Sequence, residues 1–368
     1  MNRPSILHRL NTLIRAEWQH LTAITPSDRR WQMPFAGALA SALPLVVGAF
    51  FGHLGYGLIS SVGGLVFLYQ PHTALSHRMV WLMACAFGMT ACYALGLIAH
   101  FLPLTQAGVL GIITMLVTMV CRFYRVGPPG SLFFVMAAAI AIYTPGVVED
   151  IPLRVGLLTM GALLASLIAF FYSLYILRLV APEATPTLQP ATFDFVVFDS
   201  VMIGAFVALS LVLAQALQLD RPYWVPISCL AVIQGASLRA VWNRQLQRVL
   251  GTAAGMVLAW GMLSMPLSPW SIALLVFVLV FIIESTVVRH YGFAVIFITP
   301  LTILLAEAAM LDQLPAAAEL IQSRFNDTVL GCLVGLVGGI CLHSRHFRAL
   351  LGPLLRRLLP SRPAQRNS

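Results

Sequence analysis

The chain has 368 residues, of which 59% are hydrophobic and only 10% charged, and its formal net charge is +9 at pH 7. Because soluble domains carry about 25% charged residues, this composition excludes an ordinary soluble protein. Residues 31–77, 79–121 and 249–283 contain no Asp, Glu, Lys or Arg. These stretches break at Gly, Pro or polar residues into pieces of about 20 residues, enough to cross about 30 Å of hydrocarbon. The sequence therefore predicts an all-α polytopic membrane protein, and it lacks the alternation of a membrane β-barrel.

Residues 1–30 are basic and amphipathic, without the apolar core and small-residue cleavage site of a signal peptide. Within them, residues 5–22 place several apolar side chains on one helical face. This pattern predicts a helix lying on the inner leaflet, and simple anchoring is its plainest role. The basic tail at residues 344–368 has the same character.

About twelve membrane spans follow in chain order. The first six form a membrane repeat over residues 31–177, a short linker covers 178–195, and the last six form a second repeat over 196–343. The expected spans are 33–52, 55–69, 79–102, 106–121, 129–144, 153–177, 196–217, 222–237, 246–265, 269–287, 290–308 and 320–343.

The arginines support this map. With the N-terminus placed in the cytoplasm, only Arg154, Arg221 and Arg324 of the 22 basic residues fall on the outer side. This bias follows the positive-inside rule and predicts that both termini are cytoplasmic. It also accounts for the positive net charge without a nucleic-acid partner.

The two halves resemble each other in spacing. Pairs of similar residues recur at offsets of 163 to 170 positions: Gln70 with Gln234, Gly88 with Gly251, Arg154 with Arg324, and Gly161 with Gly331. Since each half holds an even number of spans, both enter the membrane in the same direction. The spacing thus predicts a parallel repeat, an arrangement typical of transporters.

Short or proline-broken spans stand at matching places in the two halves, at the second and eighth and at the fifth and eleventh positions. Such pairs are a pointer to a transporter binding site, so these four spans are expected to line a central polar path. The alternative is that Gly and Pro simply help membrane helices to pack.

Charged residues inside the spans call for a structural or functional explanation, because inserting one at the centre of a membrane helix costs roughly 2.5–3.5 kcal/mol. Arg248 lies in the ninth span, and Arg324 and Asp327 share a face of the twelfth, where they could form an i,i+3 ion pair. Glu284 and Asp199 lie nearer to span ends. The functional interpretation makes the arginines anion ligands and the carboxylates proton carriers; the alternative is that they snorkel to the interfaces.

No catalytic or nucleotide-binding motif such as HExxH, GxSxG, the P-loop or GxGxxG occurs in the structural setting that it requires. The six cysteines lack the spacing of metal ligands. We therefore expect no enzyme activity, no metal and no cofactor.

The second half carries the sequence TyrTrpValPro at 223–226, then Gln234, Arg248-x-x-Gly251-Thr252, and Arg324-x-x-Asp327-Thr328. These motifs resemble the fusaric acid resistance and aromatic acid exporter family, which is related to p-hydroxybenzoate efflux pumps and, distantly, to plant aluminium-activated malate transporters. The first half resembles it more loosely, with Gln70 but no arginine matching Arg248. Many family members also carry a large cytoplasmic domain, where this chain has only the short linker.

The resemblance implies a bacterial inner-membrane exporter of small organic, often aromatic, carboxylic acids that is driven by the proton gradient and gives resistance to toxic acids. Its partners would be the organic anion, the lipid bilayer and, by analogy, a periplasmic adaptor. Asp327 and Glu284 would couple protons or gate the path, and the expected substrate-binding residues are Arg248, Gln70, Gln234, Tyr223, Trp224, Thr252 and Arg324. An anion channel and a non-transporting membrane subunit are the alternatives.

Overall fold

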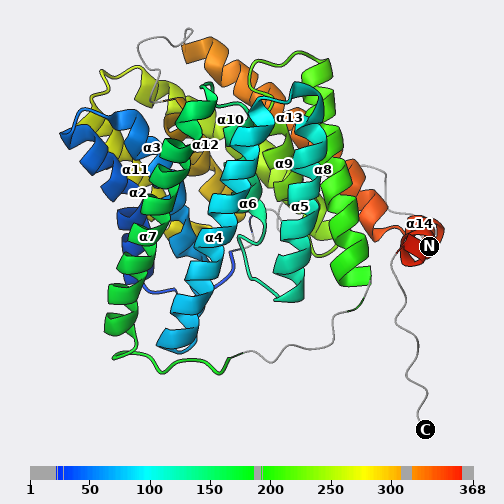
Figure 1. Cartoon of the computed structure of the whole chain (residues 1–368), viewed down its shortest axis with the longest axis horizontal. Helices are drawn as coiled ribbons and strands as arrows, with labels where there is room; N and C mark the ends of the chain where they lie inside the picture. The colour runs from blue at the N-terminus through cyan, green and yellow to red at the C-terminus, as the bar shows by residue number, and fades with distance from the viewer. Residues whose placement is uncertain are drawn as a thin grey trace, which may run out of the picture.

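The structure, a computed structural model, describes residues 22, 24–27, 29–185, 192, 194–307 and 317–358, and the regular elements in these ranges are all helical. Eight helices are long and apolar enough to cross a membrane. They are α2 (Gln32–Phe50), α4 (Leu75–His100), α5 (Gln106–Phe123), α7 (Ile151–Ile176), α8 (Asp199–Ala216), α10 (Leu238–Leu263), α11 (Pro269–Thr286) and α13 (Ala317–His343). The prediction of an all-α membrane protein is confirmed (Figure 1).

Each of four shorter apolar helices stands between two long ones along the chain. They are α3 (Leu54–Gly64), which the 3-10 turn η1 (Leu65–Tyr69) extends, α6 (Leu132–Ile142), α9 (Trp224–Ile233) and α12 (Tyr291–Glu307). They lie at the second, fifth, eighth and eleventh expected spans. The smaller elements are η2 (Pro103–Thr105), η3 (Val148–Asp150), the π-helical turn η4 (Asp194–Phe198) and the terminal helix α14 (Arg345–Leu358). Eight candidate spans are therefore supported by length, and the total of twelve crossings stays a prediction.

The short helices sit inside the protein. At a rise of about 1.5 Å per residue, the ten residues of α9 reach only about 15 Å, half of the hydrocarbon thickness. All ten residues of α9 are buried, as are most residues of α6. Irregular backbone at membrane depth is tolerated only where protein or a wet cavity surrounds it. The long helices supply that surrounding, so the ends of α6 and α9 can serve a site.

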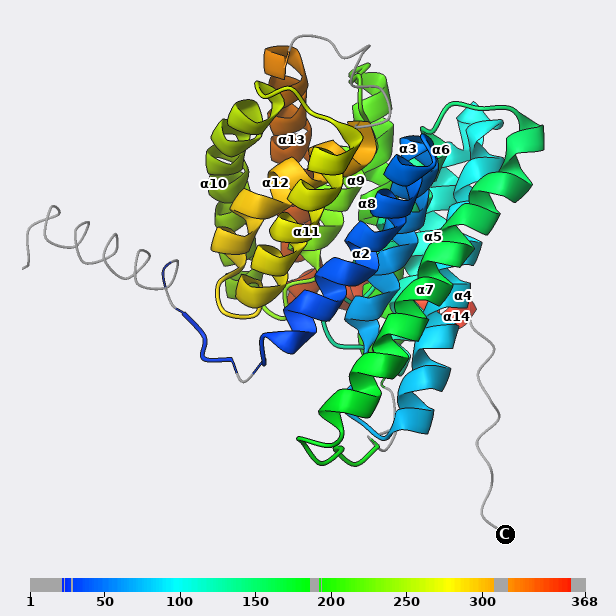
Figure 2. The same ribbon diagram turned by 90° about the vertical axis from the view of Figure 1, so that its left-hand side faces the viewer.

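The two halves pack in the same pattern. In the first half α4 packs on α6 and α7, and α7 also packs on α3; in the second half α10 packs on α12 and α13, and α13 also packs on α9. The contacts between the halves are matched as well. The first helix of the first half, α2, packs on α11 of the second half, and the first helix of the second half, α8, packs on α5 of the first. Figure 2 shows α10–α13 on one side, α4–α7 on the other, and α2 beside α11 between them.

Two glycines at an offset of 170 residues explain one of these matched contacts. A Cβ atom added at Gly161 of α7 would collide with the carbonyl oxygen of Ser60 in α3. One added at Gly331 of α13 would collide with the carbonyl oxygen of Val225 in α9. Each long helix therefore approaches its short neighbour closely only because a glycine stands at the crossing.

The start of α2, the end of α7 and helix α14 all lie toward the lower end in Figure 2. This common end is the one that the arginine distribution assigns to the cytoplasm. The inner-leaflet helix expected at residues 5–22 lies outside the described residues except for Thr22, and so does the tail beyond residue 358.

Candidate functional site

A cavity of about 1170 Å³ lies between the two halves. Its wall is formed by α3 with η1, α5, α6 and the loop before α6 from the first half, and by α9, α10, α11 and α12 from the second, and residues of η4, α8, α13 and α14 complete it. Exposed Arg125, which follows α5, and the half-buried Arg244 near the start of α10 stand in the wall at the end to which the arginine distribution assigns the cytoplasm. We call this end the mouth. The expectation that the four short spans line a path is consistent with this wall, because α3 with η1, α6, α9 and α12 all contribute residues to it.

Arg248 lies deeper in the same cavity, on α10. Ten residues of helix separate it from Leu238, so it stands about 15 Å from the start of α10. Its side chain is 4% exposed, and it donates hydrogen bonds to the hydroxyls of Tyr291 (3.2 Å) and Ser228 (3.3 Å). The Nε atom has no hydrogen-bond partner. This buried cation is held by neutral hydroxyls, which leaves its charge available to an anion.

Trp224 opens α9 and forms part of the cavity wall, one turn beyond Ser228. The guanidinium of Arg324 lies over its indole ring at 3.6 Å from the ring centroid, a cation–π contact. Tyr223 packs against the same indole with ring centroids 5.0 Å apart, but it is not part of the cavity wall. Trp224 is 2% exposed, so only a small part of its side chain reaches the cavity.

Arg324 and Asp327 are both buried in α13, as the positions of charges inside the last span predicted. The i,i+3 ion pair between them is not formed: within the described residues, no ion pair joins the two side chains. Arg324 instead donates a hydrogen bond to Thr302, and its Nε and Nη1 atoms are without partners. The Oδ2 atom of Asp327 is buried and also unpartnered. The long arginine side chain extends onto Trp224 and Thr302, which helical spacing alone does not reveal.

The two glutamines of the matched pair have different surroundings. Gln234, at the end of α9, lines the cavity and donates a hydrogen bond to Ser131 across the boundary between the halves (2.6 Å). Gln70 instead donates to Ser173 of α7 and is not part of the cavity wall. Thr252 is buried one turn beyond Arg248 and does not line the cavity either. The structure therefore brings together Arg248, Trp224 and Gln234, with Arg324 and Tyr223 behind the tryptophan.

Glu284 of α11 lines the cavity and is neutralised. Its carboxylate accepts a hydrogen bond from Arg29, which precedes α2, at 2.8 Å. The Arg29 guanidinium also donates to the backbone carbonyl of Glu284 at 3.0 Å. This pair ties α11 to the beginning of the first half at the mouth.

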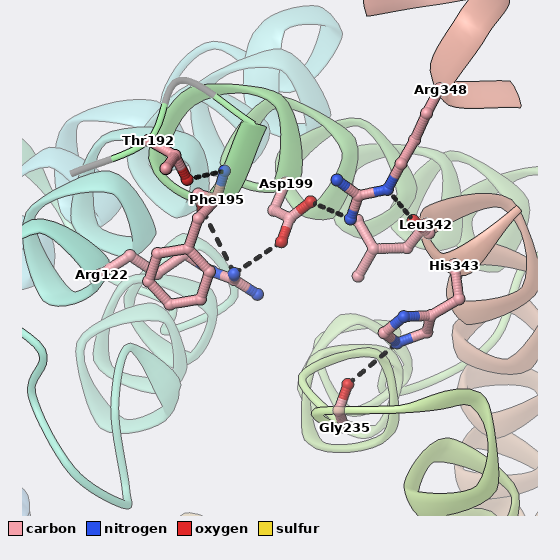
Figure 3. A network of polar contacts seen from close by, with 8 residues as sticks. All are labelled: Arg122, Thr192, Phe195, Asp199, Gly235, Leu342, His343 and Arg348. Atoms are coloured by element: carbon pink, nitrogen blue, oxygen red, sulfur yellow. Dashed lines mark hydrogen bonds and ion pairs between the residues drawn. The ribbon is translucent and has the colours of Figure 1, made fainter. Parts of the chain in front are cut away.

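Asp199 is neutralised from two sides (Figure 3). Arg122 from α5 and Arg348 from α14 each approach one of its carboxylate oxygens at 2.7 Å. Figure 3 also shows His343 bonded to the carbonyl of Gly235 beside this network. The network joins both halves and the terminal helix at the mouth.

The described wall of the cavity is strongly cationic. It holds two carboxylates, Asp199 and Glu284, and six arginines: Arg29, Arg122, Arg125, Arg244, Arg248 and Arg348. Three of the arginines are used by the two carboxylates. In the part of the chain that the structure describes, the side chains of the other three have no acidic partner. A cleft with such an excess of positive charge concentrates anions.

Sequence reasoning missed the groups that hold the charged residues in place. Ser228 and Tyr291 position Arg248, Thr302 positions Arg324, and Arg29 neutralises Glu284. Ser228 was visible as a polar residue within a short apolar helix. Arg29 lies 255 residues from Glu284, so no local signal connects the two.

Known proteins support the membrane character and the family resemblance of the second half. Residues 201–338, which run from α8 to α13, match the family described as fusaric acid resistance protein-like. A relative named uncharacterized membrane protein YvaC, from Bacillus subtilis (strain 168), is 30% identical over 139 residues. That match covers 38% of this chain and 22% of the relative, so the chain aligns with about a fifth of that protein's length. No solved structure matches. Residues 201–338 of this multi-pass membrane protein thus form a fusaric acid resistance protein-like domain.

Proposed function

We propose that this protein is a transporter of the bacterial inner membrane that exports small organic, preferentially aromatic, carboxylates and so protects the cell from toxic acids. The observation that carries the proposal is Arg248, a buried cation in a cavity between the halves that is held by neutral hydroxyls only. The fusaric acid resistance protein-like match over residues 201–338 supports a role in transport.

The carboxylate of the substrate would bind Arg248. A guanidinium binds a carboxylate through two parallel hydrogen bonds, which gives both affinity and orientation. The aromatic ring would then point deeper, toward Trp224. A contact between two aromatic rings is favourable, and the cation–π contact with Arg324 helps to hold the indole in place. Gln234 would contribute a hydrogen bond on the opposite wall.

Transport would use two parallel repeats of six helices, with twelve crossings and both termini in the cytoplasm. The matched packing of α4–α6–α7 and α10–α12–α13 supports this arrangement, as do the exchanged contacts α2–α11 and α5–α8. In transporters of this kind, one repeat rocks against the other around a site near the membrane centre. The cavity would be the inward-facing form of that site.

Coupling to protons would involve Asp327. Its buried Oδ2 atom has no hydrogen-bond partner, and it lies one helical turn from Arg324. A carboxylate in this position gains or loses a proton in answer to the charge beside it. Glu284 was a second candidate, and its contact with Arg29 favours a role in closing the cytoplasmic mouth instead.

The proposal is tested by comparing export of benzoate, 4-hydroxybenzoate and acetate from loaded cells that express wild type, Arg248→Ala or Arg239→Ala. Arg239 is the matched control, because it lies exposed on the same helix and outside the cavity wall. We expect Arg248→Ala to lower export of the aromatic acids at least tenfold and Arg239→Ala to leave it unchanged. Equal export by all three proteins would refute the assignment.

Reconstituted vesicles separate this function from its alternatives. A transporter coupled to protons responds to an imposed pH gradient at zero voltage, whereas an anion channel follows voltage alone. Flux by the purified protein without any other component would exclude a subunit that only supports a partner, and it would also show that no periplasmic adaptor is needed for the membrane step.

A further inference from the structure

A second arginine lies in the cavity wall one helical turn from Arg248. Arg244 and Arg248 are spaced i,i+4 on α10, so they lie on the same face of the helix with a rise of about 6 Å between them. Arg244 is on the mouth side and Arg248 on the deep side. Trp224 lies farther from the mouth than Arg248. From the mouth inward, the cavity wall thus presents Arg244, then Arg248, then the aromatic side chain of Trp224.

Arg244 has no visible structural role. Within the described residues, no hydrogen bond or ion pair engages its guanidinium, in contrast to Arg29, Arg122 and Arg348, which pair with carboxylates. The wall that it shares with Arg248 also holds apolar side chains, such as Val280 and Ile283. Arg244 is half-buried at the mouth and brings a positive charge to the cavity without an acidic protein partner, so an anionic ligand can pair with it.

A ligand with one carboxylate would neutralise only Arg248. Arg244 would remain unpaired. A ligand with two anionic groups about one helical turn apart would neutralise both arginines. The volume of about 1170 Å³ leaves room for such a ligand, since pockets for drug-sized molecules span about 300–1,000 Å³.

We propose that Arg244 and Arg248 form a pair of anion subsites, and that the preferred substrates are aromatic acids with a second anionic group, such as a second carboxylate. This inference rests on the proposed function and narrows its substrate class. The dianion would lie along α10, with one group on each guanidinium and its ring near Trp224. Arg125, across the mouth from the first half, would add attraction during entry.

The test uses two probes that differ by one carboxylate, benzoate and isophthalate. Their affinities for the purified full-length protein are measured by titration calorimetry for wild type, Arg244→Gln, Arg244→Lys and the control Arg239→Gln, which removes the same charge from the same helix outside the cavity. We expect wild type to bind isophthalate at least about tenfold more tightly than benzoate, because one charge-assisted contact is added. Arg244→Gln should remove most of this preference without changing benzoate affinity. Arg239→Gln should retain it, and Arg244→Lys should retain part of it.

Equal affinity for the two acids in wild type would overturn the inference, and this comparison does not depend on any variant folding. An equal loss for both acids in Arg244→Gln would also overturn it, since that result describes a general effect on the cavity. If benzoate export depends on Arg248 in the cell assay above while isophthalate binds no more tightly than benzoate, the paired subsites are refuted and the proposed function stands. If wild type binds neither acid, the proposed function fails as well.

Discussion

Asp199 pairs with two arginines at once, and its replacement by Asn gives a sharp test of the fold at the mouth. Its two carboxylate oxygens accept from Arg122 and Arg348 at 2.7 Å each. In the variant Asp199→Asn, the shape of the side chain is kept but its charge is lost. The two guanidinium groups then face each other across a neutral amide that can accept only one of their hydrogen bonds well.

The size of the effect follows from burial. The Asp199 side chain is 8% exposed, whereas those of Arg122 and Arg348 are 17% and 33% exposed. Breaking a fully buried ion pair costs about 3–5 kcal/mol, and an exposed pair about 0.2–1 kcal/mol. With the carboxylate buried and both arginines in part solvated, we expect a loss of about 2–3 kcal/mol. Helix α14 should bear most of it, because Arg348 is its ion-pair contact with Asp199 and a large part of its other contact is the apolar packing of Phe347 and two leucines on Phe198 and Met202.

Hydrogen exchange of residues 345–358 in the detergent-solubilised protein measures this local loss. Protection of α14 should fall by about 30-fold or more in Asp199→Asn, while protection of α9 and α13 should change little. In Asp199→Asn/Arg348→Gln, the repulsion between the two arginines is absent. The double variant should therefore be more stable than the two single effects predict. Effects that add within about 0.5 kcal/mol would show that the network is not coupled, and they would refute this reasoning.

Three further variants test other parts of the structure. Gly331→Ala should lower the melting temperature because its Cβ atom would collide with the carbonyl of Val225, at a cost of about 1–3 kcal/mol, whereas Gly261→Ala, where nothing lies within 4 Å, should be neutral or slightly stabilising. Trp224→Leu should reduce the transport of benzoate relative to acetate by about tenfold, and an unchanged ratio of the two fluxes would contradict a ring contact. Asp327→Asn should abolish stimulation of flux by an imposed pH gradient in vesicles, and retained stimulation would place the proton site elsewhere.

The positions of the helices were well predicted from the sequence because hydrophobic length and proline placement are local signals. The short elements at α6 and α9 were visible as spans bounded by Pro128–Pro129 and Pro145, or opened by Pro222 and Pro226 and ended by Gln234–Gly235. Their depth of burial was not visible. It depends on which long helices surround them, and apolar residues face lipid and protein alike.

The environment of each charge was predicted least well. Spacing along α13 placed Arg324 and Asp327 on one face, but it gave no information on where the arginine side chain would extend. Tertiary neighbours decide this, and here the face of Trp224 is the neighbour. Likewise, Glu284 and Asp199 were open between proton carriage and anchoring, and their partners come from distant parts of the chain.

The difference between the halves explains why a matched position need not have a matched role. At the offset that relates Gly88 to Gly251, the position equivalent to Arg248 is Cys85, a buried residue of the apolar core of the first half. Gln70 correspondingly bonds to its own half, whereas Gln234 bridges to the other. Packing between helices constrains both halves in the same way, through contacts such as those at Gly161 and Gly331. Both halves contribute charges to the cavity wall, because Arg29, Arg122 and Arg125 come from the first half and Arg244, Arg248 and Arg348 from the second. The two halves supply these charges from different places in the chain, so the charge at Arg248 need not recur at Cys85, which is buried in the apolar core instead.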